Sequence, residues 1–332
     1  MQKKINVLIT GGGGYVGSHL SMFLLKKNFF NVFSIDDFSN SKKNITLKLK
    51  KKFKKNYFFE KIDIRDQKKI SHFFLKKNID IVVHLAAKIE ASESFEKKKE
   101  YKVINLDSTK NLIKNSITYK VKQFIFASSA AVYGNVSSGY CSEKKVCHPI
   151  NPYGEYKLQA ERYMFKNKKK MNFGIFRFFN IGGVNKFFYP FFHNRSSIFF
   201  LLASLLHNPK KLFLINKSNG FTKDNTPERD FIHIDDISKI IYHSLLSKKF
   251  FFVINCGTGI RTSVSKLIQR LEKVSGIKIR TKFRGARIGD PISVISNPDY
   301  LKKNIKKIKF SSINKILKDC YQMSLSRNSK SK

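Results

Sequence analysis

Acidic residues, cysteine and long apolar runs are all scarce in this chain of 332 residues. The four cysteines, Cys141, Cys147, Cys256 and Cys320, form no C-x-x-C pair, so neither a zinc knuckle nor a disulfide framework is expected. No run reaches the roughly 18 apolar residues that a membrane-spanning helix needs. The first residues also hold too short an apolar run for a signal peptide. We therefore expect a cytoplasmic protein with no metal site and no membrane partner.

Aspartate and glutamate number only 23 against 65 lysines and arginines, which gives a formal net charge of +42. Such a charge normally suggests a polyanionic partner. The lysines are scattered along the whole chain, however, among abundant Asn, Ile and Phe, as an AT-rich genome would produce. We interpret the charge as a solvated surface that helps anionic substrates to approach, and we expect no nucleic-acid partner.

Strand-like and helix-like segments alternate through the first 180 residues. Apolar runs predict strands at 4–10, 31–38, 57–66, 79–87, 121–130 and 172–181. Helical spacing predicts helices at 11–27, 68–78, 105–120 and 152–167. This alternation is typical of an α/β fold with a Rossmann-type, doubly wound parallel sheet.

The pattern changes after residue 180, and 182–228 reads as irregular and aromatic. A strand and helix are predicted within 229–246, a strand at 250–259 and a helix at 263–276. We therefore expect an NAD-binding domain at 1–179, to which 230–257 returns. A smaller C-terminal α/β substrate domain would comprise 180–229 and 258–326, and 327–332 would be a frayed tail.

A glycine-rich turn follows the first strand. Gly11, Gly14 and Gly17 are spaced three apart, and Gly12, Gly14 and Gly17 also satisfy G-x-G-x-x-G. Such glycines permit a tight turn, a close approach to a pyrophosphate and close packing of helix on strand. Asp36 ends the second strand, where an acid can hold ribose hydroxyls, and this favours NAD over the phosphorylated cofactor.

Four other polar residues near strand ends have less certain roles. Asp37 either contacts the cofactor or caps its own loop, and Asp63 either meets the adenine or caps a turn. His84 and His233 are interpreted as structural.

Tyr153 and Lys157 lie four residues apart on a predicted helix, which places them on one face. Asn151 suits the position before that helix, and Pro152 suits its first turn. A free tyrosine has a pKa of about 10. A nearby ammonium and a nicotinamide cation would lower that pKa and make Tyr153 a general base. Ser129 ends the fifth strand and could hydrogen-bond the same substrate hydroxyl.

Taken together, these motifs resemble the extended short-chain dehydrogenase/reductase family, and within it the enzymes that epimerise nucleotide sugars at C4. The matching stretches run from residue 5 to about 300. They are ITGGGGYVGSHL, IDDFSNS, DIRD, VVHLAAKIEASES, FIFASSAAVYG, NPYGEYKLQAE, FRFFNIGG, TKDNTPERDFIHIDDI, NCGTG and RGARIGDP.

The resemblance implies three groups of site residues. The catalytic residues would be Ser129, Tyr153 and Lys157. The cofactor NAD would be bound by Gly11, Gly14, Tyr15, Val16, Gly17, Asp36, Asp37, Phe38, Ser39, Asn40, Ser41, Asp63, Ile64, Leu85, Ala86, Ala87, Lys88, Ile89, Asn105 and Phe179. The UDP-sugar would be held by Asn180, Arg229, Arg287 and Asp290, and arginine forks suit a diphosphate independently of the resemblance.

The implied activity is the interconversion of UDP-galactose and UDP-glucose. The resemblance implies that Tyr153 takes the proton of the 4-hydroxyl while NAD takes the hydride. The 4-keto sugar then turns its other face, and hydride and proton return. Sister 4,6-dehydratases carry Asp-Glu after the strand-end serine, and sister decarboxylases usually carry a glutamate there. Ala130 and Ala131 stand there in this chain, so epimerisation is preferred. A homodimer formed through a four-helix contact is also implied.

Several positions depart from the family pattern. The loop 182–200 has no H/N-L-x-P turn, and Ser197, Ile198 and Phe200 stand in its place. INKSNGF (215–221) replaces a glycine-aspartate-tyrosine stretch, and Ile89 fills a position that usually carries lysine. Val294 replaces a residue that is bulky where N-acetyl sugars are excluded. Two alternatives therefore remain: a 4-epimerase of another UDP-sugar, such as UDP-N-acetylglucosamine or a uronic acid, and a degraded NAD-binding protein with RNA affinity.

Overall fold

The computed structural model describes residues 3–136, 140–189, 197–208, 210–247, 251–305 and 308–328. Its residue contacts divide the chain into two compact units. Unit 1 comprises Met1–Val132, Pro152–Arg177 and Ser238–Ile254, and unit 2 comprises Tyr133–Asn151, Phe178–Ile237 and Asn255–Lys332. The sequence-based boundaries differ from these at 133–151, 178–179, 230–237 and 255–257, which belong to unit 2. The roles given to the two domains remain predictions.

A seven-stranded sheet forms the centre of unit 1, in the order β11-β7-β5-β4-β1-β2-β3. Its strands are β1 (Ile5–Thr10), β2 (Phe30–Asp36), β3 (Tyr57–Lys61), β4 (Ile81–His84), β5 (Gln123–Ser129), β7 (Asn172–Phe178) and β11 (Phe251–Cys256). The pairings of β1 with β2 and β4, of β2 with β3 and of β4 with β5 are parallel. The order reverses between β1 and β4, which is the point where doubly wound sheets bind ligands. The predicted Rossmann-type fold is confirmed.

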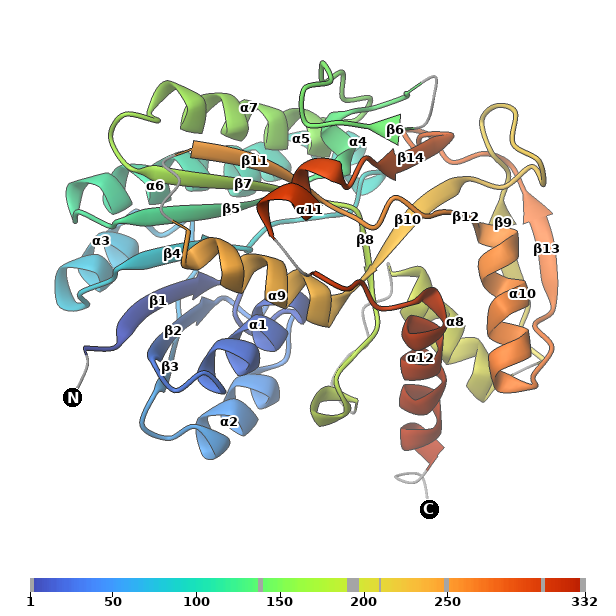
Figure 1. Cartoon of the computed structure of the whole chain (residues 1–332), viewed down its shortest axis with the longest axis horizontal. Helices are drawn as coiled ribbons and strands as arrows, with labels where there is room; N and C mark the ends of the chain where they lie inside the picture. Colours follow the sequence, from blue (N-terminus) through green and yellow to red (C-terminus); the bar gives the residue numbers. More distant parts are fainter. Residues whose placement is uncertain are drawn as a thin grey trace. The chain divides into compact units, whose positions relative to one another are not determined.

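Helices cover both faces of this sheet (Figure 1). They are α1 (Tyr15–Leu25), α2 (Lys43–Lys52), α3 (Gln67–Lys76), α4 (Glu93–Glu96), α5 (Lys98–Lys102), α6 (Ser108–Thr118), α7 (Pro152–Lys166) and α9 (Ile234–Leu245), with the 3-10 turn η2 (Ala130–Val132) after β5. On one face α6 packs against α3 and α7. On the other, α1 packs against α2, and Phe23 of α1 contacts Tyr242 of α9. Side chains such as Leu8, Val82 and Phe124 are fully buried in the core between these layers.

Unit 2 contains two smaller sheets. The first has β6 (Tyr140–Cys141), β8 (Asn180–Gly182), β10 (Glu228–His233), β12 (Arg261–Ser263) and β14 (Ser293–Ser296), with β10 at its centre. The second pairs β9 (Phe213–Asn216) with β13 (Thr281–Arg284). The helical elements are η3 (Lys186–Phe188), α8 (Ile198–His207), α10 (Val264–Ser275), α11 (Asp299–Asn304) and α12 (Ile313–Asn328). This mixture of strands and helices agrees with the predicted second α/β domain.

The structure corrects the sequence analysis in the segment that reads as irregular, because α8 and β9 lie within 182–228. Helix α8 is apolar along nearly its whole length, so it lacks the alternation of polar and apolar faces that identifies a surface helix. It is buried instead, since it packs against α12 and its Phe199 and Leu202 are almost fully shielded. Helix α12 extends through Asn328, so two residues of the predicted tail are helical, and 329–332 lie outside the described residues.

A π-helical turn, η1 (Val103–Asp107), separates α5 from α6. It places Asn105 and Leu106 in the interior. The hydroxyl of Ser108 donates to the carbonyl of Val103, five residues earlier, at 2.8 Å. Such π-helical turns occur frequently at functional sites, and this one carries a predicted cofactor-binding residue, Asn105.

Among the helices of the described residues, none is both long enough and apolar enough to cross a membrane.

Candidate active site

The turn between β1 and α1 contains the predicted phosphate-binding glycines. Gly11 has a φ of 68°, and a Cβ there would lie 2.9 Å from the amide nitrogen of Ala86. A Cβ on Gly17 would lie 2.3 Å from the carbonyl oxygen of Gly11. Helix α1 therefore lies so close to the turn that a side chain larger than that of glycine would not fit at Gly17. The helix begins after Gly14 with no side-chain cap and no acid in its first turn, so its first amides can bind an anion.

Asp36 lies at the end of β2, beside this turn. Its carboxylate accepts hydrogen bonds from the amide of Gly13 (2.9 Å), the amide of Phe38 (2.8 Å) and the hydroxyl of Ser41 (2.8 Å). Burial raises the pKa of Asp36, and these three hydrogen bonds oppose that effect. Asp37, in contrast, accepts from the amide and hydroxyl of Ser39, so it caps its own loop. The remaining predicted residue of this loop, Asn40, is exposed.

Asp63 follows β3 and forms a two-pronged ion pair with Arg65, whose nitrogens lie 2.5 Å and 2.8 Å from Oδ2. The hydrogen bond from Arg65 holds the pKa of Asp63 below its ordinary value. Its carboxylate also accepts from the amide of Arg65, and its carbonyl from the amide of Asp66, so Asp63 caps a turn. Ile64 belongs to the apolar core.

His84 connects β4 to the glycine turn through a buried network. The Thr109 hydroxyl donates to the carbonyl of Asn105, so it accepts from Nε2 of His84 at 2.8 Å. The other ring nitrogen then accepts from Thr10, whose oxygen also receives the amides of Leu85 and Ala86. Burial lowers the pKa of His84 to about 3, so the ring is neutral and structural, as predicted.

Asn105 holds the predicted cofactor-binding loop, residues 85–89, by the backbone of Lys88. Its Oδ1 accepts from the amide of Lys88 at 2.9 Å, and its Nδ2 donates to the carbonyl of Lys88 at 2.8 Å. The ammonium of Lys88 lies 2.9 Å from Glu100 and 3.6 Å from Glu93. Ile89 is 53% exposed. Lys88 and Asn105 therefore organise the loop 85–89, in which Leu85, Ala86, Ala87, Lys88 and Ile89 were assigned to the cofactor.

The three predicted catalytic residues are brought together in unit 1. Tyr153 and Lys157 lie on α7, and Ser129 ends β5. The side chains of Ser129 and Tyr153 are hydrogen-bonded. The ammonium of Lys157 donates to the carbonyl of Ala127 at 2.7 Å and lies 5.9 Å from the centre of the Tyr153 ring. Tyr153 and Lys157 are 8% and 3% exposed, so the pair is shielded from water.

The sequence analysis predicts that a nearby ammonium and a nicotinamide cation lower the pKa of Tyr153. In the chain alone, the pKa of Tyr153 is raised instead. Burial raises the pKa of Tyr153, although the hydrogen bond with Ser129 opposes this rise. Burial also lowers the pKa of Lys157 to about 7, against the attraction of Glu161. Desolvation is the largest cause of both shifts, and the sequence argument left this effect out.

Lys157 is next to a buried cluster of charged side chains, Glu161 and Arg177, which the sequence analysis did not predict. Arg177 donates to both oxygens of Glu161, at 3.1 Å and 2.6 Å, and Ser128 donates to Glu161 at 2.5 Å. Glu161 follows Lys157 by four residues on α7, so helical spacing could have identified it as its neighbour. Arg177 lies on β7, sixteen residues further on, and only the fold brings it there.

The predicted substrate residues lie in unit 2. Arg229 on β10 forms an ion pair with Asp290, and its guanidinium also donates to the carbonyl of Glu228 at 2.8 Å. Asp290 is joined to Arg287 by a turn, because its amide donates to the Arg287 carbonyl at 3.2 Å. The amide nitrogen of the Asn180 side chain donates to the carbonyl of Asp230 at 3.3 Å.

Phe179, which was predicted to contact the cofactor, is 5% exposed, and its backbone amide donates to the carbonyl of Cys256.

The unusual loop of residues 182–200 is described only in part, since 190–196 lie outside the described residues. Ser197 precedes α8, and Phe200 is buried within it. In the second unusual stretch, Asn216 ends β9 and accepts from Arg284 on β13 at 2.5 Å. His233 is fully buried and hydrogen-bonded to Asp319 at 2.7 Å, which supports its structural interpretation.

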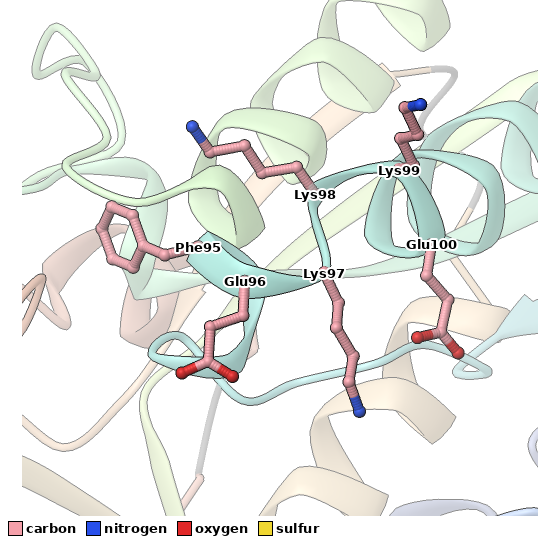
Figure 2. A pocket seen from close by; sticks show the side chains of 6 residues that line it. All are labelled: Phe95, Glu96, Lys97, Lys98, Lys99 and Glu100. Carbon is pink, nitrogen blue, oxygen red and sulfur yellow. The ribbon is translucent and has the colours of Figure 1, made fainter.

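One pocket lies on a different part of the chain from the catalytic residues. Figure 2 shows its lining, which consists of Phe95, Glu96, Lys97, Lys98, Lys99 and Glu100. All six lie in one continuous stretch that runs from α4 through Lys97 into α5. We therefore place the candidate active site at Ser129, Tyr153 and Lys157 and assign this pocket no part in catalysis. Within the described residues, no group of three His, Cys, Asp or Glu side chains is arranged to hold a metal.

Known proteins share both the sequence pattern and the fold. Residues 7–257 match the model of the NAD dependent epimerase/dehydratase family. A UDP-glucose 4-epimerase of Schizosaccharomyces pombe is 29% identical over 95% of this chain and 93% of its own. The structure of UDP-glucose 4-epimerase from Bifidobacterium longum, in complex with NAD+ and UDP, is 26% identical with a TM-score of 0.89, covering 97% of this chain and 99% of its own.

A third relative is named for two sugars. The structure of the UDP-Glc/GlcNAc 4-epimerase from Campylobacter jejuni is 29% identical with a TM-score of 0.80, covering 97% of this chain and 99% of its own. The family model spans more than half of this chain, and the glycine turn, the acid after β2 and the Ser129, Tyr153 and Lys157 group all fall within the matched residues. The chain therefore belongs to the NAD dependent epimerase/dehydratase family.

Proposed function

We propose that this chain interconverts UDP-galactose and UDP-glucose by epimerisation at C4. The observation that carries the proposal is the grouping of Ser129, Tyr153 and Lys157, with Ala130 and Ala131 directly after the serine. The group can handle the proton of a sugar hydroxyl. The two alanines provide no carboxylate for elimination of water, so oxidation at C4 followed by reduction at the same carbon is the favoured outcome.

The residues of unit 1 fit NAD as the cofactor. The glycine turn opens α1 with no acid in the helix's first turn, which suits a pyrophosphate. Asp36 Oδ2 accepts a hydrogen bond from Gly13, and a carboxylate oxygen can accept two, so it can also accept a ribose hydroxyl. A carboxylate at this place also repels a 2′-phosphate. When bound, NAD supplies reversible hydride transfer at C4 of the sugar.

The chain's own residues move the proton and orient the sugar. Tyr153 takes the proton of the 4-hydroxyl through its phenolic oxygen and later returns it to the 4-keto oxygen, after the sugar has turned its other face. Ser129, hydrogen-bonded to Tyr153, binds the same hydroxyl and keeps it in reach. Because burial raises the pKa of Tyr153, the base needs additional positive charge nearby, and Lys157 and the nicotinamide cation are the groups that can provide it.

The substrate's diphosphate would be held by unit 2. Arg229 and Arg287 supply guanidinium groups, and Asp290 and Asn180 complete the set. The ion pair with Asp290 already fixes Arg229 in one orientation, which reduces the ordering cost when a diphosphate binds.

The decisive experiment is turnover of UDP-galactose to UDP-glucose, read through a coupled UDP-glucose dehydrogenase. We expect turnover by the wild type and a loss of at least about a thousandfold in Tyr153→Phe, because the phenolic oxygen carries the proton. The variant should keep its bound NAD. A wild-type enzyme that holds NAD but is silent with UDP-galactose would contradict the proposal, and so would a Tyr153→Phe variant of ordinary activity.

A second substrate, UDP-N-acetylglucosamine, is favoured by Val294. This small side chain lies on β14 in register with Arg229 on β10. In the family that the chain resembles, a bulky residue at this position excludes the N-acetyl group. We propose that the chain turns over this sugar as well. Absence of its turnover by an enzyme active on UDP-galactose would exclude it. Replacement by tyrosine, Val294→Tyr, should suppress only the N-acetyl substrate.

We also propose a cytoplasmic homodimer. The cysteines Cys141, Cys147, Cys256 and Cys320 are all free, which suits a reducing compartment. Helix α7 packs against α5 and η1, and exposed apolar side chains such as Val103 and Phe165 lie on these elements. A mass of twice 38.5 kDa in light scattering would support the dimer, and a monomer at micromolar concentration would exclude it.

A further inference from the structure

Ser94 contacts the backbone of the candidate catalytic base. Its hydroxyl oxygen accepts a hydrogen bond from the amide of Tyr153 at 3.2 Å, although the two residues are 59 positions apart. Tyr153 is the second residue of α7, and the geometry of an α-helix gives such an amide no acceptor within its own helix. Ser94 therefore caps the start of α7 from another part of the chain. It is completely buried.

The segment that carries Ser94 is fixed on several sides. The Ser94 hydroxyl donates to the carbonyl of Ala91 at 2.5 Å, which sets its direction. The hydroxyl of Tyr101 donates to the carbonyl of Glu90 and to the carboxylate of Glu93, both at 2.8 Å. Lys97 donates to Glu93 at 2.7 Å, one helical turn away. In Figure 2, Glu96, Lys97 and Glu100 extend to one side of this segment, while Lys98 and Lys99 point elsewhere.

The same segment is tied to the cofactor-binding loop. Lys88 of that loop is paired with Glu93 and Glu100, and its backbone is held by Asn105. Helices α4 and α5 also pack directly on α7. One braced segment, residues 88–105, therefore connects the loop assigned to the cofactor with the backbone of Tyr153.

We propose that Ser94 is a positioning residue for Tyr153, which sets the place of the phenolic oxygen by holding the first turn of α7. The proposal rests on the proposed function. A general base must stand within hydrogen-bond reach of the hydroxyl it deprotonates, and an error of about 1 Å in such a position can reduce a rate by up to about a hundredfold. Loss of the cap should therefore lower kcat and leave substrate binding nearly unchanged.

The test compares the wild type with Ser94→Ala, Ser94→Thr and Ser116→Ala. Ser116 is a matched control, since it is also fully buried and its hydroxyl donates to a backbone carbonyl, that of Leu112, at 2.8 Å. For Ser94→Ala we expect kcat to fall about tenfold, with KM for UDP-galactose and the bound NAD within about twofold of the wild type. Ser94→Thr keeps the hydroxyl and should recover the rate, and Ser116→Ala should behave as the wild type.

Amide exchange provides a readout that needs no substrate. Hydrogen exchange of the Tyr153 amide, followed by mass spectrometry of peptides that span its position, should accelerate in Ser94→Ala and not in Ser94→Thr. The value of kcat and the protection of the Tyr153 amide from exchange must change together across the variants. A Ser94→Ala enzyme with wild-type kcat, unchanged exchange at Tyr153, or a fall in kcat matched by an equal loss of bound NAD would overturn the proposal. If the wild type is silent with UDP-galactose, the proposed function fails, and the exchange result still decides whether Ser94 holds α7.

Discussion

Arg177 donates hydrogen bonds to both carboxylate oxygens of Glu161, and both side chains are almost completely buried, at 6% and 5% exposure. Two opposite charges are thus held in the interior of unit 1, one helical turn from Lys157. Breaking such a pair costs more than it contributes when intact, because the remaining charge is left buried without a partner.

Glu161→Gln should therefore destabilise the protein by about 3–5 kcal/mol. Replacing both charges, in Glu161→Gln with Arg177→Met, should restore most of that loss, since the guanidinium is no longer buried without its carboxylate. Urea unfolding of the wild type, the single variant and the double variant measures both quantities. A double variant less stable than the single one would show that the pair itself, and not the orphaned charge, supplies the stability.

Lys157 should make stability depend on pH in a defined direction. Burial lowers its pKa to about 7, whereas its ordinary value is 10.5. Between these values the unfolded chain binds a proton that the folded chain does not, so stability rises with pH and is lost as pH falls toward 7. The difference in unfolding free energy between wild type and Lys157→Met should rise by up to about 1.4 kcal/mol per pH unit between pH 7.5 and 9.5.

The measurement is urea unfolding at several pH values with matched NAD content. Lys170→Met, at an exposed position, is the control and should give a difference that is flat with pH. A flat difference for Lys157→Met as well would mean that the buried ammonium keeps its ordinary pKa.

Gly17 should tolerate no side chain. A Cβ there would lie 2.3 Å from the carbonyl oxygen of Gly11, and a backbone atom cannot move aside as a flexible side chain can. We expect Gly17→Ala to lose most of its bound NAD, measured by chromatography after denaturation. Gly285→Ala is the control, because a Cβ at Gly285 meets nothing within 4 Å. Full NAD content in Gly17→Ala would show that the cofactor does not depend on this close approach.

Arg229 should act on substrate affinity more than on the chemical step. Its planar guanidinium can bind two diphosphate oxygens at once, and an ammonium cannot. Arg229→Lys should raise KM for UDP-galactose at least about tenfold while kcat changes by less than about threefold. Arg270→Lys on the exposed side of α10 should change neither value. A fall in kcat at constant KM would place Arg229 at the reacting carbon instead.

The sequence predicted the parts of this protein that depend on local patterns. Alternating apolar strands and helices gave the doubly wound sheet, and the strand, glycine turn and helix at 5–25 lie where the pattern placed them. The pairing of Tyr153 with Lys157 followed from the spacing of four on one helix. These features need only the periods of strands and helices and the special backbone of glycine.

The features that the sequence did not predict depend on contacts between distant residues or on desolvation. The bond from the Tyr153 amide to Ser94 joins residues 59 positions apart, and no local pattern encodes it. Helix α8 was missed because it is apolar on every side. The upward shift of the Tyr153 pKa was not predicted, because its largest cause is burial, which is a property of the folded chain.

The π-helical turn η1 limits which deletions this segment of the chain can tolerate. A regular α-helix through 98–118 would need one residue fewer at this turn, and its hydrogen bonds would be more favourable. Deleting that residue would rotate the preceding segment by about 100° against α6, since each residue advances a helix by that angle. Asn105 could then no longer face both backbone groups of Lys88. The chain thus retains a less stable turn that fixes the direction of one amide side chain, and a deletion that improves the helix would release the loop 85–89 from Asn105.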